Sequence, residues 1–510
     1  YKLFSGQQKV SENEILPIYS SNKNITQNSL RKLVEKFLVN FLNYFEENIP
    51  DELIKEYKIM ERKSAIKNIH YPVSMKEIEE AKRRFAIEEL LILELGILKN
   101  RFIIENSNSK NYEVEGKKEK VRDFLSQLTF NLTNAQKKVI KEIYDEISNG
   151  KIVNRLIQGD VGSGKTVVAM VMLIYMAENA YQGALMAPTE ILANQHYLGI
   201  KERLEKIGLR VELLTSSIKG KKKNEILEGI ANGDIDIVIG THSLIEDNVV
   251  FKKLGLIVID EQHRFGVNQR KILAGKAEAV NVLVMSATPI PRTLAATVFG
   301  DMDFSVIKSK PSNRKEIITR YVTDKSRERA YTEVYKEIKR GYRAYVVAPA
   351  IDENDDSDIA SVTSLYEELQ GRFNDVNLGL IHGRLDKLEK ERIMNEFATG
   401  EIELLVSTVV IEVGIDVPEA TVIVIENSER FGLAQLHQLR GRVGRSDKQS
   451  YCYLICYSDS ENAVNRMNAM VTMSDGFEIS EEDYRLRGAG DLMGTMQHGY
   501  SGNSFYDLFG

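Results

Sequence analysis

The amino-terminal part of the chain carries apolar residues at helical spacing. From Ser29 onward they recur every three or four positions, so they form one stripe on a helix. Ser74 and Glu77 have the spacing of a capping box and predict the start of a second, longer helix. The three consecutive basic residues 82–84 are interpreted as a solvated face of that helix, and the polar stretch 106–120 as a linker. This part of the chain is therefore expected to be helical.

From about residue 125 the hydrophobic pattern changes. Short runs rich in β-branched residues alternate with longer helical stretches, which is typical of parallel sheets connected by crossover helices. The alternation occurs twice, and the segment 308–314, which contains Pro311, interrupts it. The first set of expected strands is 154–157, 184–186, 235–239, 256–259 and 282–285, and the second set is 317–322, 344–347, 378–381, 404–406 and 422–425. The pattern predicts an α/β fold with two tandem parallel-sheet lobes.

The composition is that of an ordinary globular protein. The 510 residues are 43% hydrophobic and 28% charged, with 34 Gly and 9 Pro, which excludes the collagen-like, low-complexity and disordered classes. The apolar run 167–177 is shorter than the ~20 residues that span a bilayer, so we expect a buried helix and no membrane segment. A net charge of −6 excludes a generally basic surface, although local basic patches can still bind nucleic acid.

The cysteines and the first residues bear on the cellular compartment. Cys452 and Cys456 cannot build a disulfide framework, and they lie in an apolar run that predicts a core strand. A reducing cytoplasm fits this cysteine usage. Because the sequence opens on Tyr1 without a charged leader before an apolar stretch, we expect no signal peptide and interpret the chain as a fragment.

A phosphate-binding loop stands between an expected strand and the long apolar helix. It reads Gly159, Asp160, Val161, Gly162, Ser163, Gly164, Lys165 and Thr166. Glycines let backbone N–H groups surround phosphate oxygens at a helix amino terminus, the lysine reaches the terminal phosphates, and the threonine hydroxyl can ligate Mg²⁺. A chance glycine-rich loop is a poor alternative, because the pattern and its strand-to-helix context agree. The sequence therefore predicts a nucleotide site.

Asp260 and Glu261 end another expected strand. A nucleotide-binding lobe needs a carboxylate near magnesium and a second group that polarises the attacking water. We assign Asp260 to Mg²⁺, through water, and Glu261 to the role of general base. An acidic strand end is more often a solvated turn when it stands alone, but here it accompanies the phosphate loop.

The motifs and their order resemble those of the superfamily 2 helicases. Matching segments lie at 132–136, 187–190, 240–244, 260–263, 286–289, 381–384, 407–408, 413–416 and 438–445. The resemblance implies two RecA-like lobes and ATP hydrolysis, with Gln136 reading the adenine and with Gly414 and Asp416 near the nucleotide. Arg442 and Arg445 would reach the γ-phosphate across the cleft as arginine fingers. The residues implied in nucleic-acid contact or coupling are Thr189, Thr241, Ser286, Thr288, Arg384, Thr408 and Gln438.

Finer matches resemble the RecG family of bacterial branched-DNA translocases. They are carried by the box 260–267 and by the segment 475–499, which resembles the translocation motif of that family. Its Arg485, Arg487 and Gln497 are implied to transmit lobe closure to duplex DNA. The implied domains are the end of a β-barrel (OB-like) wedge at 1–20, a helical connector at 21–124, the first lobe at 125–310, the second lobe at 311–460, and the translocation hairpin with a short tail at 461–510.

The resemblance implies an ATP- and Mg²⁺-dependent DNA helicase that remodels stalled replication forks and Holliday junctions in DNA repair and recombination. The implied partners are branched double-stranded DNA and single-stranded-DNA-binding protein, and a cytoplasmic monomer without membrane contact is expected. Two alternatives stay open. A transcription-repair-coupling translocase would need a polymerase-binding domain, which is not expected here. A nucleotide-gated, non-catalytic DNA clamp should have lost Glu261 or an arginine finger. The basic cluster at 219–223 fits a backbone contact and a solvated loop equally well.

Overall fold

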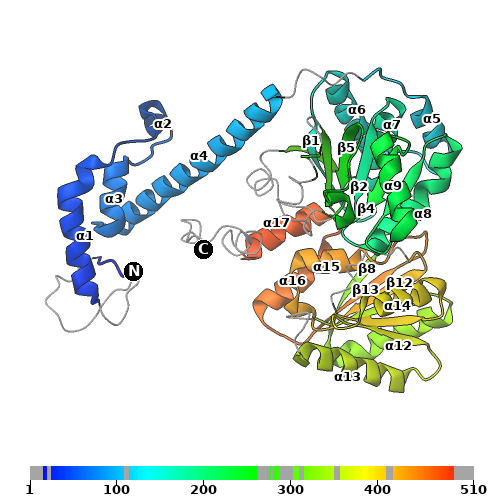
Figure 1. Ribbon diagram of the computed structural model, residues 1–510. Coiled ribbons are helices and arrows are strands. Elements are labelled where there is room, and N and C mark those ends of the chain that lie inside the picture. Colours follow the sequence, from blue (N-terminus) through cyan, green and yellow to red (C-terminus); the bar gives the residue numbers. More distant parts are fainter. Residues whose placement is uncertain are drawn as a thin grey trace. The chain divides into compact units, whose positions relative to one another are not determined.

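The computed structural model describes residues 15–19, 25–107, 114–261, 273, 275–276, 280–286, 302–308, 315–349, 356–408 and 417–487. The chain divides into two compact units (Figure 1): a smaller one that holds the amino-terminal helices and a larger one, Arg101–Leu486. Within the described ranges, no helix combines the length and the apolar character needed to cross a membrane.

The smaller unit is helical, as the apolar periodicity predicts. Its elements are α1 (Gln27–Phe41), η1 (Leu42–Tyr44), α2 (Asp51–Glu56), α3 (Arg62–His70) and α4 (Met75–Ser107), which continues into the larger unit. At the start of α4 the Ser74 hydroxyl accepts from the N–H of Glu77, and the Glu77 carboxylate accepts from the N–H of Val73. The predicted helix start at Ser74 is confirmed.

Arg84 of α4 is fully buried, so the prediction of a solvated face is wrong at this position. Its guanidinium lies 3.0 Å from Glu88 Oε2, one turn further along the helix, and pairs with Glu47 Oε1. It also donates to Asn48 Oδ1 at 2.8 Å, whereas the neighbouring Arg83 is exposed. A buried charge needs paired partners. One partner comes from 37 positions away, and the local charge pattern of a helix does not reveal it.

We expect Arg84→Ala to lower the free energy of unfolding of the smaller unit by about 3 kcal/mol, because it leaves the carboxylates of Glu47 and Glu88 without their buried cation. Denaturant unfolding followed by far-ultraviolet circular dichroism measures the change. Arg83→Ala is the matched control and should cost less than about 1 kcal/mol. Equal effects of the two variants would contradict the assignment.

The larger unit contains two parallel sheets. The first has the strand order β3-β4-β2-β5-β6-β1-β7. Its strands are β1 (Asn154–Gly159), β2 (Gln182–Met186), β3 (Val211–Leu214), β4 (Ile237–Gly240), β5 (Leu254–Ile259), β6 (Asn281–Ser286) and β7 (Asp303–Ile307). The accompanying helices are α5 (Glu119–Ser126), α6 (Asn134–Ser148), α7 (Lys165–Glu178), α8 (Glu190–Lys206), α9 (Gly220–Asn232) and the short η2 (His242–Ile245). The expected domain boundary at 124 falls inside α5, whose Phe124 packs in the core of this first lobe.

The five strands predicted for the first lobe are confirmed, and each boundary agrees within two residues. The sequence pattern missed β3 and β7. Both are edge strands of the sheet and contain partly exposed residues, so neither forms the continuous apolar run that marks a buried parallel strand.

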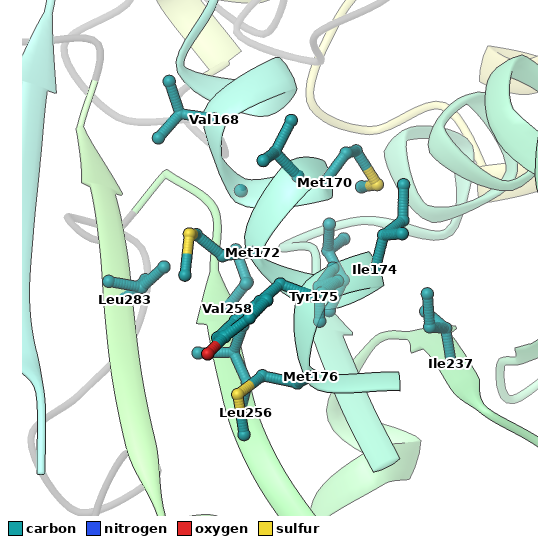
Figure 2. Close-up of a cluster of buried hydrophobic side chains, with 14 of the residues drawn as sticks. Val168, Met170, Met172, Ile174, Tyr175, Met176, Ile237, Leu256, Val258 and Leu283 are labelled. Atoms are coloured by element: carbon teal, nitrogen blue, oxygen red, sulfur yellow. The ribbon is translucent and has the colours of Figure 1, made fainter. Parts of the chain in front are cut away.

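Helix α7 lies at the centre of the first core (Figure 2). The side chains of residues 168–177 are all buried. Figure 2 shows this helix against the sheet, where Leu256, Val258 and Leu283 face its Met172 and Tyr175. The buried helix predicted from the apolar run is confirmed. Because the last two residues of the phosphate loop, Lys165 and Thr166, are the first two of α7, this packing anchors the loop to the core.

The second sheet has the order β10-β11-β9-β12-β13-β8. Its strands are β8 (Ile318–Thr323), β9 (Arg343–Val347), β10 (Leu378–Ile381), β11 (Leu404–Ser407), β12 (Ala420–Ile425) and β13 (Tyr451–Cys456). The helices are η4 (Asp324–Ser326), α12 (Arg327–Lys339), α13 (Asp356–Arg372), α14 (Lys387–Thr399), η6 (Ser428–Arg430), α15 (Leu433–Arg440), α16 (Glu461–Thr472) and α17 (Gly476–Arg487). All predicted strands of this lobe are confirmed, and β13 holds Cys452 and Cys456 as buried, free thiols.

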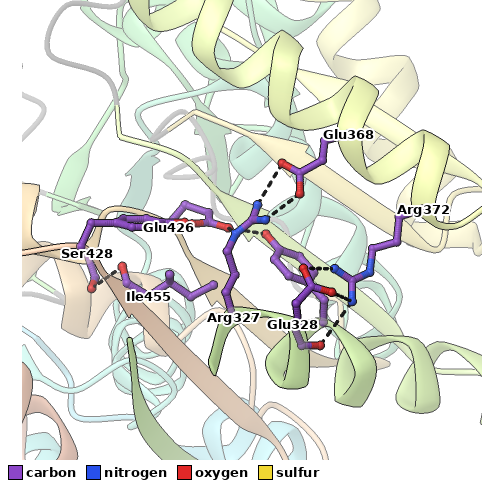
Figure 3. A network of polar contacts seen from close by, with 9 residues as sticks. Arg327, Glu328, Glu368, Arg372, Glu426, Ser428 and Ile455 are labelled. Atoms are coloured by element: carbon purple, nitrogen blue, oxygen red, sulfur yellow. Dashed lines mark hydrogen bonds and ion pairs between the residues drawn. The ribbon is translucent and has the colours of Figure 1, made fainter. Parts of the chain in front are cut away.

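A buried carboxylate fastens α12 to the end of β12 (Figure 3). Glu426 Oε1 accepts from Arg327 Nε at 2.8 Å and from the Tyr331 hydroxyl at 2.6 Å. The other guanidinium nitrogens of Arg327 bind both carboxylate oxygens of Glu368 on α13. The next residue, Asn427, has a left-handed φ of +46°. The network therefore fixes the sharp turn from which the chain enters η6 and α15.

Candidate active site

The predicted site residues of the first lobe gather at one edge of its sheet. In a parallel sheet all carboxyl ends lie at the same edge. The phosphate loop 159–166 follows β1 and Asp260 follows β5, whereas Thr189 follows β2 and Thr241 follows β4. The strand order runs β4-β2-β5-β6-β1, so Thr189 and Thr241 lie at one side of this edge and Asp260 and the phosphate loop lie at the other. Ser286, the last residue of β6, lies between Asp260 and the loop.

The phosphate loop needs glycine for backbone reasons. Gly162 and Gly164 have φ values of +74° and +83°, a region that side chains rarely adopt. A Cβ at Gly164 would also lie 2.1 Å from Gln136 Nε2. The loop thus leads into α7 with its backbone N–H groups at the helix amino terminus, where a phosphate is stabilised.

Lys165 is buried at the first position of α7, and its Nζ donates to the backbone oxygens of Gly159 at 2.7 Å and Asp160 at 3.0 Å. Burial lowers the pKa of Lys165, the nearby acidic charges of Glu261, Asp260 and Asp160 act in the opposite direction, and the charge of Arg445 lowers it further. The Ser163 hydroxyl is buried and has no hydrogen-bond partner among the described residues. A cation and an unsatisfied hydroxyl around a glycine loop fit the phosphates of a nucleotide.

The side chain of Gln136 packs against the phosphate loop. Its Nε2 donates to the carbonyl of Ser163 at 2.9 Å, and its Oε1 accepts from the N–H of Thr133 at 2.8 Å, which completes a capping box on α6. The side chain therefore ties α6 to the phosphate loop. Its predicted contact with adenine stays a prediction.

Asp260 is held through both carboxylate oxygens. His196 Nε2 lies 2.8 Å from Oδ2, and the N–H of Glu261 donates to Oδ1 at 3.0 Å. Burial alone would raise the pKa of Asp260, but the hydrogen bond from His196, together with the charges of His196 and Lys165, lowers it overall. His196 is not among the residues predicted from the sequence, where its place on the helix after Thr189 is the one local signal.

Glu261 has a φ of +51°, which is unusual for a side chain of this size. Such backbone strain clusters at functional sites, where the surrounding structure fixes an otherwise unfavourable direction. The observation agrees with a special role for Glu261, while its assignment as general base stays a prediction.

The chemistry of the site suits Mg²⁺ held largely by a nucleotide. No group of three or more His, Cys, Asp or Glu side chains in the described part of the chain could hold a metal ion by itself. Mg²⁺ commonly binds one or two carboxylates together with substrate phosphates. Asp260 at the end of β5 and Thr166 in the first turn of α7 are the residues that would hold it here.

The helix α15 of the second lobe contacts the phosphate loop of the first. His437 Nε2 lies 2.5 Å from Asp160 Oδ1, and a Cβ on Gly441 would lie 2.9 Å from the Val161 side chain. Arg445 belongs to the same stretch of chain, and its positive charge lowers the pKa of Lys165. The structure therefore brings the predicted arginine-finger segment to the nucleotide loop. His437 was missed in the sequence, although its neighbour Gln438 was singled out.

Arg440 connects the same helix to the end of α16 and to the residues that lead into α17. The Nη1 of this buried arginine donates to the backbone oxygens of Met470 and Met473 at 2.9 Å each. Its Nη2 lies 2.9 Å from His437 Nδ1. At the opposite end of α15, Asp483 of α17 accepts from the N–H of Leu433. Helix α15 thus contacts the phosphate loop. Hydrogen bonds also connect one of its ends to residues that precede α17 and the other end to α17 itself.

The predicted nucleic-acid residues differ in exposure. Thr241, Ser286 and Thr408 are buried. Thr189 caps α8 by accepting from the N–H of Leu192, and Arg384 is exposed. Arg485 is exposed on α17 and pairs with Glu482, and Gln438 is half-buried on α15.

Some predicted residues cannot be placed. Thr288, Gly414, Asp416 and Gln497 lie outside the described residues, as do 262–267 of the acidic box. Most of the predicted wedge remnant at 1–20 lies outside them as well. Residues 220–223 of the basic cluster form the start of α9 rather than a loop, and Lys223 pairs with Glu246 at 2.8 Å. A contact of this cluster with a nucleic-acid backbone stays a prediction.

Comparison with known proteins identifies the family. Residues 133–297 match the DEAD/DEAH box helicase family, and residues 326–447 match the helicase conserved C-terminal domain. An ATP-dependent DNA helicase RecG of Bacillus subtilis (strain 168) is 45% identical over 96% of this chain and 72% of its own length. The chain belongs to the RecG family. The RecG helicase of Thermotoga maritima is 44% identical over 100% of this chain and 66% of its own length.

A solved structure of RecG bound to a three-way DNA junction has a TM-score of 0.77 and 43% identity, and the match covers 97% of this chain and 65% of that one. This RecG likeness confirms the predicted α/β fold with two RecA-like lobes. The chain spans about two thirds of the length of the RecG relatives that it matches. Neither alternative raised by the sequence is favoured by these matches.

Proposed function

We propose that this chain is the motor of a RecG-type enzyme, which couples ATP hydrolysis to translocation on branched double-stranded DNA. The contact between the phosphate loop and α15 carries the proposal, because it joins the nucleotide residues of one lobe to the arginine segment of the other. The solved RecG relative is bound to a three-way DNA junction, which supports a branched substrate. Stalled replication forks and Holliday junctions, in repair and recombination, belong to that class.

The nucleotide residues have distinct proposed roles. Lys165 would exchange its bonds to the loop carbonyls for bonds to phosphate oxygens, and the Ser163 hydroxyl would gain a partner. Asp260 and Thr166 would hold Mg²⁺, which when bound neutralises phosphate charge. Glu261 would accept the proton of the attacking water.

The second lobe would bring the positive charges of its arginines to the phosphates only when the two lobes are closed. Arg442 and Arg445 sit on the segment that contacts Val161, so a change in the cleft changes their distance from the phosphates. Arginine fingers act on the charge that develops in the transition state. Nucleic-acid contacts from the half-buried Thr189 and the exposed Arg384 would hold the strand between successive closures.

The direct test measures ATP turnover with no DNA, with a linear duplex and with a synthetic three-way junction. We expect turnover that requires Mg²⁺, and a larger stimulation by the junction than by the duplex. Turnover that no DNA stimulates would sink the proposal. The same proposal includes a cytoplasmic monomer and single-stranded-DNA-binding protein as a partner. Cys452 and Cys456 are buried and form no disulfide, which agrees with a reducing compartment.

Helix α17 leads to a prediction about coupling. We expect Arg485→Ala to leave DNA-stimulated ATP turnover largely intact and to abolish displacement of a triplex strand from duplex DNA, because α17 is bonded to α15 but lies outside the nucleotide loop. Arg487→Ala should behave in the same way. Triplex displacement and ATP turnover are measured on the same preparations.

Because Arg485 is exposed, a role in coupling can be distinguished from a purely structural role. Its side chain is 72% exposed and contacts Glu482 on its own helix, so its truncation should cost little stability. Glu482→Gln is the matched control, because it removes the ion pair and keeps the arginine. Parallel loss of turnover and displacement with a lowered unfolding midpoint would show that Arg485 only stabilises the hairpin.

A further inference from the structure

We call the boundary between strands β2 and β5 of the first sheet the border, because Thr189 and Thr241 lie on one side of it and Asp260, Ser286 and the phosphate loop lie on the other. These strands are neighbours, and beyond their paired residues the N–H of Asp260 donates to the carbonyl of Met186 at 2.9 Å. After β2 the chain reaches Thr189, which caps α8, and after β5 it reaches Asp260. Thr189 and Asp260 therefore follow neighbouring strands, on opposite sides of this border.

His196 bridges the border. It lies on α8 two turns after Thr189, and its Nε2 is 2.8 Å from Asp260 Oδ2. The two side chains are 14% and 13% exposed, so water competes little for this contact. A carboxylate oxygen accepts a hydrogen bond, so this contact forms with a proton on Nε2 of His196.

The bridge constrains Asp260 strongly. One carboxylate oxygen receives the N–H of Glu261 and the other receives His196, so the plane of the carboxylate is set by two groups at once. One of these groups belongs to the strand end, but the other belongs to α8. If α8 moves as a rigid element over these two turns, a displacement of its amino terminus also moves His196.

The amino terminus of α8 is itself placed to respond to a ligand. Thr189 is one of the predicted nucleic-acid residues and is half-buried. The neighbouring Glu190 accepts a hydrogen bond from the Ser216 hydroxyl, in the loop after β3. The start of α8 therefore contacts a second loop on the nucleic-acid side of the edge.

We propose that His196 is a positioning residue that joins α8 to Asp260, so that DNA bound at the start of α8 orients the magnesium carboxylate. This inference rests on the proposed function and adds to it the residue through which DNA stimulates hydrolysis. His196 touches neither nucleotide nor DNA in this scheme. Groups that orient a metal-binding side chain typically affect metal affinity or activity by 10- to 100-fold.

The test uses His196→Leu, which removes the donor, and His196→Gln, which keeps an N–H donor. Asn194→Ala is the matched control, because Asn194 is exposed on the same helix. The first readout is the affinity of fluorescent ADP with and without Mg²⁺, in the absence of DNA. We expect His196→Leu to reduce the gain in affinity that Mg²⁺ gives by about tenfold, with partial recovery in His196→Gln.

The second readout is the ratio of DNA-stimulated to basal ATP turnover. It should fall about tenfold in His196→Leu and stay unchanged in Asn194→Ala. A His196→Leu protein with the wild-type magnesium gain and the wild-type ratio would overturn the proposal. So would an equal loss of affinity with and without Mg²⁺ together with a lowered unfolding midpoint, which indicates a purely structural contact. If the wild-type protein itself lacks DNA-stimulated turnover, the proposed function fails, whereas the magnesium readout still tests the bond between His196 and Asp260.

Discussion

Lys165→Ala is expected to reduce ATP turnover by at least ~10³-fold while the chain remains folded. The Nζ of Lys165 is the buried cation of the phosphate loop. Among the described residues, its hydrogen bonds go to the backbone oxygens of Gly159 and Asp160, which belong to the loop itself. Its removal therefore takes a positive charge from the phosphates without opening the core beneath α7. Phosphate release with saturating DNA measures the turnover.

The control for this variant is Lys141→Ala, an exposed lysine on α6 in the same lobe. It should leave both turnover and the unfolding midpoint unchanged. A folded Lys165→Ala protein with wild-type turnover would show that the loop does not serve the hydrolysed nucleotide. A large fall in the unfolding midpoint would instead mean that the loop carbonyls depend on Lys165 for stability.

Arg442→Ala and Arg445→Ala are each expected to lower kcat by ~10³- to 10⁵-fold while fluorescent ATP analogues still bind. The reason is geometric. The segment that carries both arginines contacts Asp160 and Val161 through His437 and Gly441, and the charge of Arg445 already acts on Lys165. A group that approaches the phosphates from the opposite lobe contributes mainly to the transition state of the closed cleft.

Separate measurements of kcat and of nucleotide affinity decide the roles of the two arginines. Lys448→Ala is the matched control, since Lys448 is an exposed cation three residues after Arg445. It should change neither quantity. Loss confined to nucleotide affinity would contradict the finger assignment and would instead mean that the arginine binds the ground state.

The sequence by itself determined the elements whose signal is local. The phosphate loop is readable because a strand, a glycine turn and an apolar helix follow one another without interruption, and the structure has them as β1, residues 159–166 and α7. The central parallel strands are readable because burial on both faces gives a continuous apolar run. The edge strands β3 and β7 lack such a run and were missed.

The candidate site was predictable only in part, and for the same reason. Lys165, Asp260 and Arg445 lie in motifs with their own pattern. The partners that orient them do not: His196 is 64 positions from Asp260, and His437 is 277 positions from Asp160. A single histidine on a helix has no periodicity or spacing that names its partner.

Only the tertiary structure decided which side chains meet. The carboxyl edge of the first sheet puts Thr189 and Asp260 on adjacent strands, and α15 brings its histidine to a loop of the other lobe. In the smaller unit, Arg84 is buried and pairs with Glu47, which belongs to another segment of the chain. Local patterns set which helices and strands form, whereas the pairing of charges and hydrogen-bond donors depends on distances that exist only after the chain has folded.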